Sequence, residues 1–151
     1  MKIKTKFGMA MQILCILCLA GSTLYFMIGW NQIPAEVPGH YNFAGEVDSM
    51  TGKGSLIFLI VLNWVMYLGM SVLEHFPQAW NTGVKITARN RTRVYRILYH
   101  MLVCLKFSVV LIFSFITSWH ENYMPPWFLA ATLLLTFGPM IFFLVQLWRV
   151  R

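Results

Sequence analysis

Four long apolar stretches dominate the pattern of hydrophobic and polar positions along the chain: residues 7–30, 56–73, 97–119 and 127–148. A helix of about 20 apolar residues crosses the hydrocarbon core of a bilayer, so each stretch is long enough to span a membrane. The connections between them are polar or basic. The pattern therefore predicts an all-α membrane protein, a single domain over residues 1–151 that forms a bundle of four transmembrane helices.

Composition supports the membrane interpretation. The chain of 151 residues is 58% hydrophobic and 11% charged, which is more apolar surface than one small soluble core can bury. The formal net charge of +7 would suggest nucleic acid as a partner in a soluble protein. Here the cationic residues flank the apolar stretches, so we expect membrane lipids and no nucleic acid.

The cationic residues also predict the orientation, because Lys and Arg close to a spanning helix resist translocation. They are concentrated before residue 7, in the loop 75–96 and after residue 148, whereas the loop 31–55 has only Lys53. We therefore expect both termini and the basic loop in the cytoplasm, and the loop 31–55 outside. Thr87 can cap a helix that runs through the basic loop. Arg89, Arg93 and Arg96 would then share one face and contact lipid headgroups.

The external loop 31–55 is the most informative connection. Val37 to Phe43 is suited to an extended segment, and Gly45 to a turn. We interpret the loop as a folded lid at the membrane surface, structured by polar side chains that satisfy backbone groups, with Asp48 capping a turn and Lys53 pairing nearby. A metal site, or a hydrolytic site with His40 as general base and Asp48 orienting it, is chemically competent but matches no standard signature. We assign no catalytic residue, metal or cofactor.

Seven positions carry a family resemblance: Pro34, Pro38, His40, Asn42, Gly45, Asp48 and Lys53. With Ile33 and Val37 they resemble the signature of the DUF1648 membrane family, a domain of unknown function that is also the N-terminal part of SdpI-type immunity proteins. A second stretch, from Pro77 through Asn90 to Lys106, resembles the family as well, so the likeness covers roughly residues 20–119. Gly39 and Val47 depart from the family pattern, and SdpI-type proteins are longer. The resemblance implies a bacterial inner-membrane protein.

Polar residues also occur within the predicted spans. Lys106 lies about 15 Å along the third span from Arg96, where a charge costs about 2.5–3.5 kcal/mol on insertion scales. Asn63, Tyr67 and Glu74 share a face of the second span, and Tyr99 shares the face of Lys106 on the third, so these five residues could form a polar seam between the two helices. Such a seam could join the helices structurally, or it could bind and move a ligand or a proton.

Three hypotheses of function follow. The first is a protein that is not an enzyme and that senses, or gives immunity to, a peptide toxin or membrane-active agent, with an external peptide or small molecule as ligand. The second is a small carrier or accessory transport subunit that uses the seam around Lys106 and would have to form a homodimer to enclose a path. The third is a metal-dependent membrane enzyme centred on His40.

Overall fold

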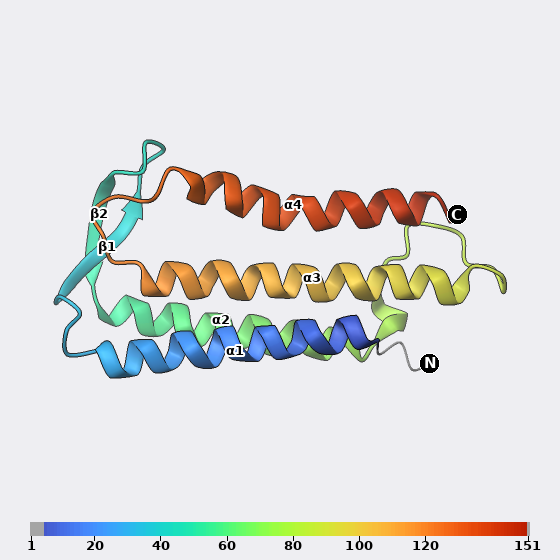
Figure 1. The fold of residues 1–151 in the computed structure, drawn as a ribbon, viewed down its shortest axis with the longest axis horizontal. Coiled ribbons are helices and arrows are strands. Elements are labelled where there is room, and N and C mark those ends of the chain that lie inside the picture. Colours follow the sequence, from blue (N-terminus) through green and yellow to red (C-terminus); the bar gives the residue numbers. More distant parts are fainter. Residues whose placement is uncertain (1–4, 151) are drawn as a thin grey trace.

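Four long helices make up most of the computed structural model, which describes residues 5–150. They are α1 (Lys6–Gly29), α2 (Gly54–Glu74), α3 (Arg91–Ser118) and α4 (Trp127–Trp148). Each is long and apolar enough to cross a membrane. They run side by side, with the loops between α1 and α2 and between α3 and α4 at one end and both termini at the other (Figure 1). We call these the hairpin end and the basic end.

Helix α3 is the centre of the arrangement. Helices α1, α2 and α4 each pack along α3, whereas α1 and α2 touch each other only slightly. In Figure 1, α4 lies on the opposite side of α3 from α1 and α2. Buried side chains are accordingly most numerous on α3. The bundle is therefore three helices around one, and α4 is attached mainly through α3.

A hydrogen bond compensates for a proline inside α4. Pro139 has no N–H, so the carbonyl of Leu135, four residues earlier, lacks its helical donor. The hydroxyl of Ser108 on α3 lies 2.6 Å from that carbonyl oxygen and donates a hydrogen bond to it. Ser108 is buried. This contact ties α4 to α3 near the middle of both helices.

The predicted all-α class is confirmed for the long helices but is incomplete for the loop between α1 and α2. That loop contains a two-stranded antiparallel sheet of β1 (Glu36–Tyr41) and β2 (Val47–Gly52). Glu36 pairs with Gly52 and Tyr41 with Val47, and the register is irregular around Gly39. Val37 on β1 is buried with Phe26 and Leu56, which seats the hairpin on the helices beneath it.

The connection between α2 and α3 contains the short 3-10 helix η1 (Pro77–Ala79). Thr87 and Asn90 then exchange hydrogen bonds between side chain and backbone, at 2.8 and 3.2 Å, and α3 starts at Arg91. Thr87 thus makes the expected cap, and the N–H of Arg91 donates to its carbonyl at 3.0 Å, but residues 88–90 form a turn and the helix itself starts only at Arg91. Arg89 lies in that turn, outside the helix.

Candidate functional site

Asn42 organises the tip of the hairpin. Its side-chain oxygen accepts hydrogen bonds from the backbone N–H groups of Ala44 (2.9 Å) and Glu46 (3.0 Å). Gly45 donates its N–H to the carbonyl of Asn42 and has a φ of 85°, in the region that glycine adopts without steric cost. These two motif residues therefore shape the turn between the strands.

The tip is held against the loop between α3 and α4. The N–H of Met124 donates to the carbonyl of Gly45 at 2.7 Å, and Glu46 and Tyr123 form an isolated β-bridge. The hydroxyl of Tyr41 donates to the carbonyl of Glu121 at 2.7 Å. Burial raises the pKa of Tyr41, and the charge of Glu121 raises it further, so the phenol stays a donor. The hairpin is thus joined to both ends of the α3–α4 loop.

Lys53 caps the end of α1. Its ammonium group donates to the carbonyls of Trp30 (3.2 Å) and Ile33 (3.5 Å), and lies 4.4 Å from the centre of a Trp30 ring. A cation at these carbonyls complements the negative end of the helix dipole. Pro34 follows this cap, and Pro38 lies in β1 opposite Met50. Lys53 and its neighbours therefore fix how the chain leaves the helix.

His40 and Asp48 form a side-chain hydrogen bond across the two strands. The Nδ1 atom of His40 lies 2.6 Å from a carboxylate oxygen of Asp48, and the two side chains are 67% and 44% exposed. The carboxylate that was expected to cap a turn thus contacts the imidazole instead. Within residues 5–150 there is no group of three or more His, Cys, Asp and Glu side chains that could hold a metal.

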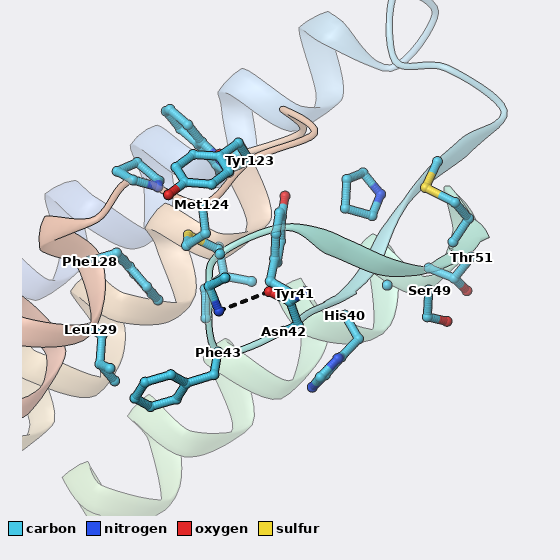
Figure 2. Close-up of a pocket in the computed structure, with 18 of the residues that line it drawn as sticks. His40, Tyr41, Asn42, Phe43, Ser49, Thr51, Tyr123, Met124, Phe128 and Leu129 are labelled. Carbon is cyan, nitrogen blue, oxygen red and sulfur yellow. Dashed lines mark hydrogen bonds between the residues drawn. The ribbon is translucent and has the colours of Figure 1, made fainter.

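An open crevice of about 1050 Å³ lies beneath the hairpin. One wall is the hairpin itself, and the others are the start of α2, the end of α3 and the start of α4 (Figure 2). Tyr41, Ser49 and Thr51 contribute polar groups from the strands, whereas Phe58, Phe128 and Leu129 contribute apolar surface from the helices. The crevice is therefore amphipathic: most of its polar side chains belong to the hairpin and most of its apolar side chains to the helices, while Phe43 and Met50 add apolar surface from the hairpin.

Sequence reasoning missed the half of this site that α4 and its preceding loop supply. Met124, Phe128 and Leu129 line the crevice, and Phe43, 97% exposed, projects beside Leu129 at its edge (Figure 2). One signal was available. The loop before Pro125 is short enough to return the chain to the same membrane surface as the hairpin, which brings the aromatic residues that follow it close to the motif.

Lys106 is completely buried and neutralised within the helices. Its ammonium group forms a short ion pair with Glu74, donates to the hydroxyl of Ser71 at 3.1 Å and lies 4.9 Å from the ring centre of Tyr67. Gln12 of α1 donates to the second oxygen of Glu74 at 2.8 Å and lies 3.3 Å from the hydroxyl of Tyr67. Three of the predicted seam residues therefore meet in one network.

The other two seam residues lie apart from that network. The amide nitrogen of Asn63 donates towards the carbonyl of Val110 and the hydroxyl of Ser114, both at 3.3 Å, nearer the hairpin end. Its amide oxygen is buried and has no hydrogen-bond partner among residues 5–150. Tyr99 packs closely on Gly8 of α1. The single seam expected from the sequence is thus three separate contacts.

The three arginines expected to face the headgroups are also divided. Arg93 and Arg96 are on α3 and line a cavity of about 400 Å³ between α3 and α4. Arg89 precedes the helix and does not line it. The three residues therefore do not form one helical face.

Comparison with known families gives one match. Residues 14–63 match the model of a family described as a domain of unknown function, DUF1648. The matched segment contains most of α1, the hairpin and the first half of α2, including all seven motif positions. The resemblance of the stretch from Pro77 to Lys106 lies outside the match and stays a prediction. No curated protein and no solved structure matches the chain.

Proposed function

With residues 14–63 identified as a DUF1648 domain, we propose that the chain is a multi-pass membrane protein that binds a membrane-active peptide in the crevice beneath its hairpin. The observation that supports this proposal best is the amphipathic lining of the crevice. Such peptides carry polar and apolar groups on opposite faces. A crevice with polar strands on one side and apolar helix ends on the other offers a partner for each face.

The shape of the site also favours a peptide. The crevice is slightly larger than the roughly 300–1000 Å³ that is usual for small-ligand sites, so it has room for several side chains. A two-stranded sheet leaves the outer edge of each strand unpaired, and such edges accept extended peptides through main-chain hydrogen bonds. Residues of both strands, among them His40 and Ser49, line the crevice.

The orientation is part of the proposal. The basic residues at the ends of the chain and in the α2–α3 connection support a cytoplasmic location for the basic end. The resemblance to the DUF1648 family supports the inner membrane of a bacterium. The hairpin end then lies outside, where a toxin or another membrane-active agent arrives. Binding there would allow the protein to sense the agent, or would remove the agent from the bilayer. Removal would give immunity without a catalysed reaction.

A survival assay tests the proposal. The chain is expressed in a sensitive bacterial host that is then challenged with a panel of membrane-active peptides. We expect higher survival with at least one peptide, and unchanged survival across the panel would refute the proposal.

A pair of matched variants locates the effect. Leu129→Trp narrows the crevice from α4, whereas Leu134→Trp makes the same change on the same helix at an exposed position outside it. We expect Leu129→Trp to abolish protection and Leu134→Trp to retain it, with equal amounts of protein in the membrane. Equal protection by both variants would show that the crevice is not the binding site.

A further inference from the structure

A second cavity lies at the opposite end of the molecule, and the proposed function does not use it. It has a volume of about 400 Å³ and is formed by the first turns of α3 and the last turns of α4, which lie side by side at the basic end (Figure 1). Three arginines line it, together with two neutral polar side chains: Arg93, Arg96, Arg149, His100 and Gln146. The arginines come from two helices that are far apart in the sequence.

The three arginines line one cavity and have no acidic partner among the described residues. The side-chain contacts between basic groups and carboxylates found within residues 5–150 are His40 with Asp48 and Lys106 with Glu74, so no described carboxylate lies within 4 Å of these arginines. Like charges that share one cavity repel each other, and a bound anion removes that cost. Arginine suits phosphate in particular, because its planar fork donates two parallel hydrogen bonds to two oxygens.

The surroundings of the cavity distinguish a lipid from a soluble anion. Ile97 and Val150 line it beside the arginines, and Ile97 is buried. One turn further along α4 towards the hairpin end, Phe142 precedes Gln146 by four residues and Val145 precedes Arg149 by four. They are 57% and 44% exposed, so an apolar surface continues from the cavity along α4. An anionic head between the arginines would therefore continue into acyl chains against α4.

His100 is fixed in place beneath the arginines. One of its ring nitrogens lies 3.0 Å from the hydroxyl of Thr5, the residue that caps α1, and the ring packs against Phe7 at 4.9 Å between centres. The floor of the cavity is thus held by α1 and does not depend on the ligand.

We propose that this cavity binds the phosphate group of an anionic phospholipid, with the acyl chains lying along α4. Arg93, Arg96 and Arg149 bind the phosphate oxygens, and Gln146 donates from the side of α4. Basic pockets between membrane helices on the cytoplasmic side bind anionic headgroups by this chemistry. The site rests on insertion of the four helices into a membrane and is independent of the crevice, which Leu129→Trp tests separately.

Native mass spectrometry of the whole chain, released from detergent micelles, measures the binding. The probes are phosphatidylglycerol, phosphatidylcholine and inorganic phosphate. The test variant is Arg96→Gln with Arg149→Gln, and the control is Arg89→Gln with Arg91→Gln. Both remove two charges from exposed positions at the basic end, but the control positions do not line the cavity.

We expect a phosphatidylglycerol adduct that phosphatidylcholine does not replace. The affinity for phosphatidylglycerol should fall about fivefold for each arginine removed from the cavity. The control variant should bind as tightly as the unchanged chain. Equal weakening in both variants would overturn the proposal, because it would indicate general attraction to a basic surface. Displacement of the lipid by equimolar inorganic phosphate would also overturn it, since the site would then be one for a soluble anion.

Discussion

The buried ion pair of Lys106 and Glu74 makes a strong prediction about stability. Lys106→Met removes the cation that pairs with the Glu74 carboxylate, whose side chain is 6% exposed, while Gln12 still donates to one of the carboxylate oxygens at 2.8 Å. Breaking a buried pair from one side costs about 3–5 kcal/mol. Because one donor remains, we expect the lower end of that range, a loss of about 3 kcal/mol of unfolding free energy.

The double variant Lys106→Met with Glu74→Gln separates the charge from the packing. A methionine nearly fills the volume of the lysine stem, and a glutamine keeps a partner for Gln12. Replacing both members of a buried pair by neutral groups is often close to neutral in stability. We therefore expect the double variant to recover most of the loss.

The measurement is unfolding of the purified protein in mixed micelles by titration with a denaturing detergent. Tryptophan fluorescence reports the unfolding, since Trp64 packs beside Tyr67 on the same helix, α2. Two results would refute the reasoning. One is a single variant as stable as the unchanged chain, and the other is a double variant no more stable than the single one. A stable Lys106→Met protein that had lost transport of a solute would instead favour the carrier hypothesis.

Three further predictions concern the hairpin. Gly45→Ala should destabilise the hairpin by about 1–2 kcal/mol, because its φ is 85° and an added Cβ would lie 2.9 Å from the Met124 carbonyl oxygen. Limited proteolysis checks this: the loop should be cleaved faster in Gly45→Ala than in Gly52→Ala, where an added Cβ meets open space. His40→Ala should change the free energy of unfolding by less than about 1 kcal/mol, because the contact with Asp48 is exposed. A stoichiometric metal that elemental analysis finds in the unchanged chain and not in this variant would contradict a purely structural role for His40 and Asp48. Lys53→Met should loosen the end of α1, seen as faster hydrogen exchange at residues 30–33, whereas Lys53→Arg should preserve protection.

The long helices could be predicted from the sequence because apolar runs of that length have few alternatives. The hairpin motif could be recognised too, since Asn42 and Gly45 have local roles that depend on residues within a few positions of each other. What could not be predicted was the partner of each polar group. Periodicity places Asn63, Tyr67 and Glu74 on one face of a helix but does not say which neighbouring helix reaches which of them.

The two cavities show the same limit. Arg149 lines the same cavity as Arg96, and Leu129 the same crevice as the hairpin, only because α4 returns along α3 with a particular depth and rotation. No local pattern in the sequence encodes that register. Arg89 shows the same limit: Thr87 is recognisable as a cap, but the sequence does not say that the residues after it form a turn and that the helix starts only at Arg91.

The contact between Ser108 and the carbonyl freed by Pro139 has a consequence for how the chain assembles in the bilayer. Lipid cannot donate a hydrogen bond, so a fourth helix that slides or turns against the third leaves the carbonyl of Leu135 unsatisfied. The hydrogen bond therefore marks the correct alignment of α4 at one point, near the middle of the helix. A single serine can thus help to position both walls that α4 contributes, one at each end of the bundle.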